Sequence, residues 1–338
     1  MATIDKRGIV HGTAGSVIYR EYRGKNIIQG KAKAFKQTEK TIQSASEFGL
    51  SSSAAAVIRT AFQPAYIFKD GTAAYRSTQQ VYRSILNSVS REKGKRDLHD
   101  GDLSLLNGMD FNTNSKLTEV LKISHSVIKS TAGLVSVILG PLNTQTDIKR
   151  PQNASGAYMK HRIRLMLIEF NFREEYYENL GYKDLDLEGY QNFKGQVITF
   201  DEKVREDCLV MVSMSLMLYT TVDQTNESIL LNNSAFSPCA IIGTFQSEKP
   251  SETPTKEVDM QLSNYRGREE KIKEMFYKGN LLMLKLHLRI GKQSGTALKK
   301  RSIECGESGV KELIPDRIRT GRVSFKKGSG LTDYDGQK

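Results

Sequence analysis

The chain has 338 residues, of which 38% are hydrophobic and 26% are charged. Lysine and arginine outnumber aspartate and glutamate by 50 to 38, so the formal net charge is +12. This length predicts two or three domains, and the composition excludes collagen-like and disulfide-stapled scaffolds. Disorder over the whole chain is also excluded, because several apolar runs are long enough to form strands.

The cysteines and the apolar runs restrict the class of protein further. Cys208, Cys239 and Cys305 lie far apart, with no Cys-x-x-Cys pair, which argues against a zinc ribbon, an iron–sulfur site or a disulfide framework. The pattern fits a reducing compartment, or a protein that does not rely on disulfides. We expect no secretory signal, because no apolar stretch follows the basic N-terminus. We also expect no transmembrane segment, because no run approaches 18 apolar residues.

The basic excess is concentrated at the two ends of the chain. Residues 1–100 carry a net charge of +9, residues 101–246 carry −4, and residues 247–338 carry +7. A basic excess attracts nucleic acid, anionic lipid or an acidic protein surface. In a chain that assembles with copies of itself, basic ends would also complement an acidic middle.

The first third of the sequence predicts short strands and then helices. Residues 8–28 are typical of two short strands with a turn at Gly24. Residues 45–62 place their apolar side chains near one face of a helix that ends before Pro64. Residues 73–90 give the strongest helical pattern of the chain. Its apolar residues recur every four positions, at Val81, Ile85 and Val89, and Tyr82 and Leu86 widen the stripe.

The middle of the chain changes to the alternating pattern of strands. Several such runs, joined by glycine, asparagine and proline, predict an antiparallel sandwich. No regular alternation of strands and helices is present, which argues against a parallel nucleotide-binding sheet. The strands are predicted at residues 134–139, 163–172, 196–200, 209–219 and 240–245.

The expected fold class is therefore α+β, in three parts. Residues 1–115 form a strand-and-helix module, and residues 116–246 form an antiparallel β-sandwich-like domain. Residues 247–338 hold a linker, a charged helix near residues 266–277, and a strand or buried helix at residues 281–290. They end in an extended basic C-terminal arm, which we expect to become ordered only on a partner.

Motifs that carry chemistry are not recognisable. The five histidines lack metal-binding spacing, and a lone histidine is usually structural. Asp97, Asp100 and Asp102 around Gly101 miss the calcium-loop pattern, so we expect a solvated acidic turn. The glycine-rich segments miss the phosphate-binding patterns, and no G-x-S-x-G elbow occurs. We expect no catalytic residues, no metal and no cofactor, and a hydrolase with an unrecognised site is the weakest hypothesis.

Two clusters of basic residues are the candidate anion or nucleic-acid contacts. With few aromatic residues nearby, such clusters would bind phosphates without reading bases. Alternatively, they form a solvated surface or a salt-bridging arm at a subunit contact. The residues are Lys31, Lys33, Lys36, Lys40, Lys299, Lys300, Arg301, Arg317, Arg319, Arg322, Lys326 and Lys327.

The N-terminal third resembles a known group of sequences. The signals are the spacing of Gly8, Gly12 and Gly15, then Val17, Gly24-Lys25, Thr41, Gln43 and Phe48, and a helix with Ala55, Ile58 and Phe62. This pattern resembles an uncharacterised family of Bacteroidetes proteins, over about residues 8–245. The resemblance implies a layout of helices followed by a strand-rich half, and it implies no catalytic residues. The basic tail after residue 247 departs from it.

These observations favour a non-enzymatic structural or assembly subunit of a larger complex, most concretely a phage virion or tail component. Its partners would be copies of itself or neighbouring assembly proteins, because extended arms that order on a neighbour lock repeating subunits together. It would be synthesised in the cytoplasm or be assembled into a virion. The alternative is a nucleic-acid-binding or packaging protein, whose affinity would fall steeply with salt.

Overall fold

The structure is a computed structural model of the chain. It describes residues 2–22, 24–32, 37–88, 91–151, 159–221, 228–253 and 268–275, together with Tyr277, Gly279 and Leu282. Over these residues the fold is α+β, with three α-helices and antiparallel strand pairing. The predicted fold class is confirmed at this level.

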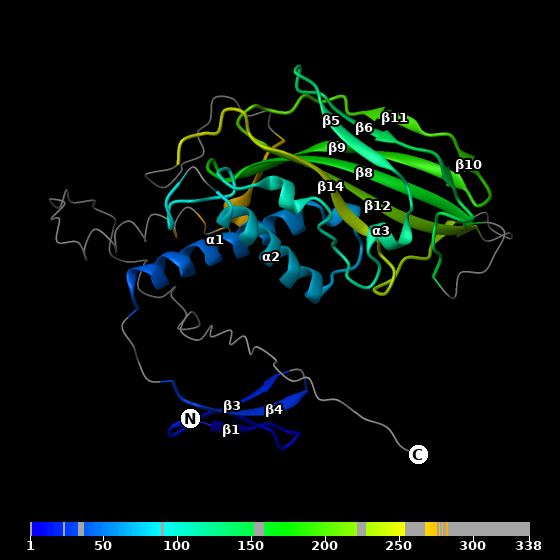
Figure 1. Ribbon diagram of the computed structural model, residues 1–338. Helices are drawn as coiled ribbons and strands as arrows, with labels where there is room; N and C mark the ends of the chain where they lie inside the picture. The colour runs from blue at the N-terminus through cyan, green and yellow to red at the C-terminus, as the bar shows by residue number, and fades with distance from the viewer. Residues whose placement is uncertain are drawn as a thin grey trace, which may run out of the picture. The chain divides into compact units, whose positions relative to one another are not determined.

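The N-terminal segment forms a four-stranded antiparallel sheet, with its strands in chain order (Figure 1). Gly15 and Gly24 have φ angles of 57° and 73°, and glycine adopts this left-handed conformation at tight reversals without steric cost. Two strands were predicted over residues 8–28. The structure has three strands there, because the chain reverses at Gly15 as well as at Gly24, and residues 2–4 pair with them as a fourth. The strands are β1 (Ala2–Ile4), β2 (Val10–Ala14), β3 (Val17–Tyr22) and β4 (Lys25–Gly30).

Two helices follow, as predicted. Helix α1 (Glu39–Ala61) begins after Thr38, whose hydroxyl accepts a hydrogen bond from the Thr41 amide at 3.3 Å. It ends shortly before Pro64, which lies in the 3-10 turn η1 (Gln63–Ala65). Helix α2 (Gly71–Leu86) begins after Asp70, whose carboxylate accepts from the Thr72 amide at 2.7 Å. Such caps satisfy amides that lack a partner within the helix. The short elements η2 (Leu103–Leu106) and α3 (Leu117–Val120) follow.

A curled antiparallel sheet forms the centre of the α+β part (Figure 1). Three strands of 13 residues each lie side by side in the order β9, β8, β12. A short strand borders β9, and two others pair with β12. The strands are β8 (Met159–Asn171), β9 (Tyr176–Glu188), β12 (Leu209–Thr221), β13 (Ser228–Leu230), β14 (Cys239–Phe245) and β15 (Glu270–Lys271).

A smaller sheet lies over one side of this large sheet, and α1 and α2 lie over the other (Figure 1). The small sheet consists of β5 (His125–Lys129), β6 (Val135–Leu139) and β11 (Gln196–Thr199), with β6 in the centre. A two-stranded pair, β7 (Leu142–Asn143) and β10 (Asn192–Phe193), accompanies it.

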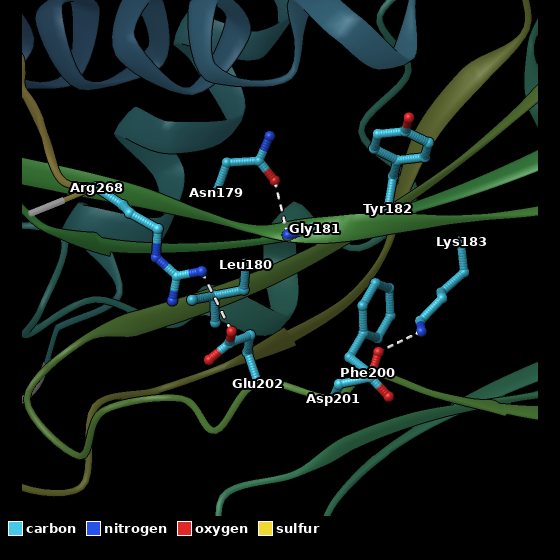
Figure 2. Close-up of a pocket in the computed structure, with 9 residues that line it drawn as sticks. All are labelled: Asn179, Leu180, Gly181, Tyr182, Lys183, Phe200, Asp201, Glu202 and Arg268. Atoms are coloured by element: carbon cyan, nitrogen blue, oxygen red, sulfur yellow. Dashed lines mark hydrogen bonds and ion pairs between the residues drawn. The ribbon is translucent and has the colours of Figure 1, made fainter. Parts of the chain in front are cut away.

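Strand β9 contains a bulge opposite Leu167 and Ile168 of β8. Gly181 at this point has a φ of 117°, and its amide donates a hydrogen bond to Asn179 Oδ1 at 2.9 Å (Figure 2). Glycine is the residue that reaches this backbone conformation without strain. The extra residue, Leu180, is buried in the same hydrophobic cluster as Leu167.

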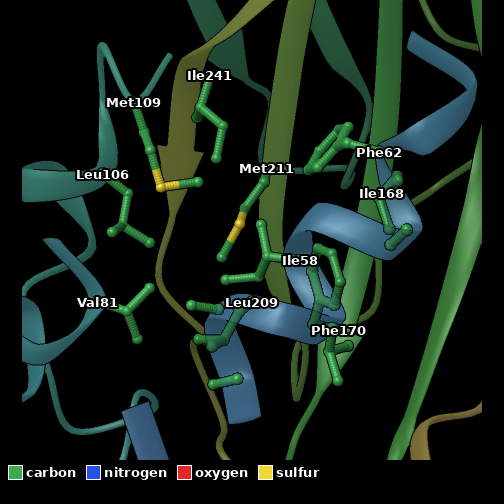
Figure 3. Packing of buried hydrophobic residues seen from close by; sticks show 14 of the residues in the cluster. Ile58, Phe62, Val81, Leu106, Met109, Ile168, Phe170, Leu209, Met211 and Ile241 are labelled. Atoms are coloured by element: carbon green, nitrogen blue, oxygen red, sulfur yellow. The ribbon is translucent and has the colours of Figure 1, made fainter. Parts of the chain in front are cut away.

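Strand β8 from Leu165 to Asn171 and strand β12 from Leu209 to Leu218 are buried on both faces, because alternate side chains enter two different clusters. Ile163 and Leu165 of β8 belong to the cluster shared with β6 of the small sheet. Ile168 and Phe170 belong to the cluster shared with the helices, where they lie close to Phe62 at the end of α1 (Figure 3). The ring of Phe62 is 6.2 Å from that of Phe170 and 5.6 Å from that of Phe111.

The five predicted strands all form, as β6, β8, β11, β12 and β14. A simple two-sheet sandwich is not confirmed, because helices cover the second face of the large sheet. The described part of residues 266–277 forms β15 and the 3-10 turn η3 (Ile272–Met275) in place of the predicted helix. The boundaries predicted near residues 115 and 246 stay predictions, and the C-terminal arm lies outside the described residues.

We expect Phe62→Ala to destabilise the protein by about 3–5 kcal/mol, because it removes a fully buried ring between helix and sheet. Phe48→Ala is the matched control, since Phe48 lies in α1 and is 43% exposed. Urea unfolding of the two variants measures the difference. Equal losses of stability would show that the end of α1 does not pack on the sheet as described.

Candidate functional site

The structure describes two of the twelve basic residues predicted to contact anions. Lys31 follows β4, Lys40 lies in the first turn of α1, and both are exposed. The anion-binding role of all twelve therefore stays a prediction. The others lie outside the described residues: Lys33, Lys36, Lys299, Lys300, Arg301, Arg317, Arg319, Arg322, Lys326 and Lys327.

In the acidic turn Asp97 is buried and Asp100 is half-buried, so the expectation of a solvated turn was wrong for these two residues, whereas Asp102 is exposed. Asp97 is 4% exposed and receives two hydrogen bonds from Arg173, at 2.7 and 3.0 Å. Arg173 also donates to Asp100 at 2.9 Å. This arginine lies in the connection between β8 and β9, so the ion pairs join two segments that are distant in sequence. Local sequence spacing gave no indication of this partner.

His99 completes the same buried network. Its Nε2 atom accepts a hydrogen bond from the Phe172 amide at 3.1 Å, and its Nδ1 atom lies 3.3 Å from the Ser247 hydroxyl. Burial lowers the pKa of His99 to about 3, with a further contribution from Arg173, so the ring is neutral at pH 7. A neutral ring that accepts from a backbone amide has a structural role, as expected for a lone histidine.

A second buried cluster surrounds Arg205. The guanidinium contacts Glu178 at 2.7 Å and Glu169 at 3.2 Å, and it also pairs with Glu269. The side chains of these three glutamates are fully buried, whereas that of Arg205 is 16% exposed. Arg268 adds a second contact to Glu178 at 3.2 Å. The arginines compensate the buried carboxylates of the paired strands β8 and β9, so loss of Arg205 would leave buried charges without their counter-ion.

A polar hollow of about 240 Å³ opens beside the bulge of β9 (Figure 2). Its charged side chains are already paired across it: Lys183 with Asp201 at 2.5 Å, and Arg268 with Glu202 at 3.2 Å. A ligand would have to displace these pairs. Its lining residues are Asn179, Leu180, Gly181, Tyr182, Lys183, Phe200, Asp201, Glu202 and Arg268.

The part of the large sheet near the start of β8 bears a ladder of ion pairs. Arg162 makes two contacts with Asp186, at 2.6 and 2.7 Å, and Arg164 makes two with Asp184, both at 2.8 Å. The Arg164 guanidinium also lies 4.5 Å from the centre of the Tyr182 ring. The arginine hydrogen bonds raise the pKa of Arg162 and lower that of Asp186. This surface is charged but internally paired.

The N-terminal sheet presents a surface whose apolar side chains have no packing layer among the described residues. Strand alternation and register place seven apolar side chains on one face, which we call the N-terminal apolar face. No described residue between positions 2 and 32 is buried, and Ile4 and Ile28 are 73% and 69% exposed. The seven residues are Ala2, Ile4, Val10, Ala14, Val17, Tyr19 and Ile28.

Within the described part of the chain, no group of three or more histidine, cysteine, aspartate or glutamate side chains is arranged to hold a metal ion. No helix in that part is long and apolar enough to cross a membrane. Cys208 and Cys239 are buried free thiols, and burial raises the pKa of each. These two thiols are therefore poor nucleophiles at neutral pH.

Comparison with known proteins gives no match: no protein-family model, no curated protein and no solved structure resembles the chain significantly. The resemblance to a Bacteroidetes family therefore stays a prediction.

Sequence reasoning missed the N-terminal apolar face, although part of its signal was visible. The alternation of Val17 and Tyr19 with Ile18 and Arg20 is readable from sequence. A single strand does not show which side chains of its neighbours share a face, because that depends on register. Here the register places Ile28 beside Tyr19 on one side of the sheet.

We expect Arg173→Ala to destabilise the protein by about 3–5 kcal/mol, because it leaves the buried Asp97 carboxylate unpaired. Arg162→Ala, which breaks a bidentate pair at a more exposed position, is expected to cost about 0–1 kcal/mol. Chemical denaturation of both variants at pH 7 compares the two losses. Similar small losses would mean that the buried network does not hold the segments together.

Proposed function

We propose that this protein is a structural or assembly subunit of a larger complex, acting through contact surfaces rather than catalysis. The concrete form that we propose is a phage virion or tail component, with copies of itself and neighbouring assembly proteins as partners. The observation that supports the proposal is the N-terminal apolar face, which lacks a second layer in the described residues.

The physical argument is that a small sheet needs a layer to pack against. A sheet buries its apolar side by packing on another element, and very small units rarely supply enough core for independent stability. The N-terminal sheet spans about 30 residues, and none of those described is buried. A contacting surface on another molecule would cover its apolar face and stabilise its strands.

The ladder of ion pairs near the start of β8 and the polar hollow beside β9 give weaker support for a binding function. Their charged side chains contact one another at hydrogen-bonding distances. The N-terminal apolar face differs from both, because the free energy falls when another surface removes its exposed isoleucines from water. For this reason the proposal rests on the face rather than on either polar site.

Size-exclusion chromatography with light scattering, at increasing concentration, tests the proposal. We expect masses above the 37.9 kDa of one chain. We expect Ile28→Lys to lower the apparent association constant at least tenfold, so that the masses shift toward that of one chain. Ile27→Lys is the matched control, because this neighbour in β4 points to the opposite face. Ile27 is the less exposed of the two, so a purely intramolecular effect would be larger at Ile27.

A strictly monomeric chain at the highest concentrations, with no partner in its native source, would contradict the assembly role. Equal effects of the two lysine substitutions would show that the N-terminal apolar face is not the contact surface.

A further inference from the structure

A second buried histidine, His161, lies near the start of β8 and is 0% exposed. Its register partners on the neighbouring strands are Leu187 of β9 and Leu218 of β12. Both leucines belong to the hydrophobic cluster shared with the small sheet. Met159 and Ile163, which share a face with His161 along β8, belong to the same cluster. The ring therefore lies on an apolar face.

Neither ring nitrogen of His161 has a hydrogen-bond partner. In this respect it differs from His99, whose ring accepts from the Phe172 amide at 3.1 Å. A buried polar group without a partner has lost its hydrogen bonds to water and has gained none in exchange. The position of His161 is therefore tolerated by the packing, and only while the ring is neutral.

The charged group that acts on His161 has the same sign as a protonated ring. This group is Arg150, which lies in the connection before β8. Its guanidinium donates to the Gly189 carbonyl at 3.1 Å, just beyond the end of β9, and its Nε atom is buried without a partner. Among the described residues, no carboxylate pairs with Arg150 or with His161. A proton on the ring would therefore meet a cation and no counter-ion.

The other charged groups of the large sheet do not face the ring. Lys160, Arg162 and Glu188 occupy the alternate positions of β8 and β9, so their side chains lie on the opposite side of the sheet. Lys183 shares the side of the ring farther along β9, but it is paired with Asp201. Strand β12 carries no charged residue.

The elements that pack over this side of the sheet offer no free carboxylate to the ring either. Strands β6, β7, β10 and β11 carry no charged residue. Lys129 of β5 pairs with Glu248 at 2.6 Å. Glu119 of α3 is exposed, and the carboxylate of Asp147 accepts from a backbone amide at 2.8 Å.

We propose that His161 makes this end of the large sheet sensitive to acid, so that a proton on its ring opens the start of β8 together with the ends of β9 and β12. The closed sheet would hold the charged ring on an apolar face beside Arg150, whereas an opened end lets the ring reach water. This inference concerns the central sheet and does not depend on the assembly role.

The pH range follows from the protonation of the ring in the two states. Burial lowers the pKa of His161 to about 4, and Arg150 contributes in the same direction, against an opposite effect of the Glu188 and Leu187 backbone. An opened end restores the ordinary pKa of 6.5. Because the closed state has the lower pKa, it is fully favoured above pH 6.5 and loses its advantage as the pH falls toward 4. Between pH 7 and pH 5, opening becomes about twentyfold more favourable.

This end is also where local opening breaks the least structure. Strand β8 begins at Met159 and β9 ends at Glu188, so His161 lies close to the ends of both. Element ends open at a lower free energy than the centre of a packed sheet. At the opposite end of β8, the buried contacts of Arg173 with Asp97 tie the chain to another segment.

Hydrogen exchange of the full chain at pH 7 and pH 5, followed by mass spectrometry of peptides from residues 159–164 and corrected for the intrinsic exchange rate, tests the proposal. In the natural chain we expect the protection of these residues to fall about twentyfold between the two pH values. In His161→Leu we expect a fall of less than about threefold, because no group at this end then gains a proton on opening.

The same variant distinguishes a tolerated histidine from one that holds the sheet together. We expect His161→Leu to exchange no faster than the natural chain at pH 7, because leucine suits the apolar face and needs no hydrogen-bond partner. His125→Leu is the matched control, since His125 lies in β5 and is exposed. It should keep the acid effect of the natural chain in full.

A second variant keeps the test decisive even where His161→Leu does not fold. Arg150→Gln retains a donor for the Gly189 carbonyl but removes the positive charge. The pKa of His161 then rises, so we expect a smaller acid effect than in the natural chain. The proposal is overturned by equal acid effects in the natural chain and His161→Leu, by an unchanged effect in Arg150→Gln, or by no acid effect in the natural chain.

Discussion

Strands β8 and β12 depend on a single constraint: successive side chains of a strand point to opposite faces, and over the second half of β8 and most of β12 both faces are buried. One set of side chains packs under the small sheet, and the other packs under α1 and α2. Fully burying a large apolar side chain contributes about 1.5–3 kcal/mol. Both layers therefore derive much of their stability from the same two strands, and neither layer would be expected to persist without them.

The buried ion pairs follow from this arrangement. Where β8 passes into β9 the chain turns at the edge of the packed layers, and Arg173 meets Asp97 and Asp100 there. A buried ion pair is weak support for stability in itself, but loss of one partner is costly. The network thus fixes which segments meet, while the hydrophobic layers supply most of the free energy.

The N-terminal sheet lacks what β8 and β12 possess. Its strands alternate in the same way, and its register gathers the apolar residues on one face, but no described residue of the sheet is buried. Covering such a face with another apolar surface would lower the free energy of the sheet. The proposed assembly role rests on this one feature.

The sequence predicted the elements better than their contacts. The apolar runs of β8 and β12 were recognisable because strands buried on both faces are apolar throughout much of their length. Strand β9 was missed because one part of it alternates charged with apolar residues, as at Asp184, Leu185 and Asp186. The partners of Arg173, of Arg205 and of the N-terminal strands depend on register and long-range packing, which a single sequence does not contain.

Hydrogen exchange of the backbone amides tests the central claim most directly, because it reports on the N-terminal sheet and on the central strands in one experiment. The account predicts that amides of β3 exchange rapidly in dilute protein and become protected as the protein assembles, while amides of β8 stay protected throughout. Equal and strong protection of β3 in a monomeric sample would contradict it, because the sheet would then be stable without a covering layer.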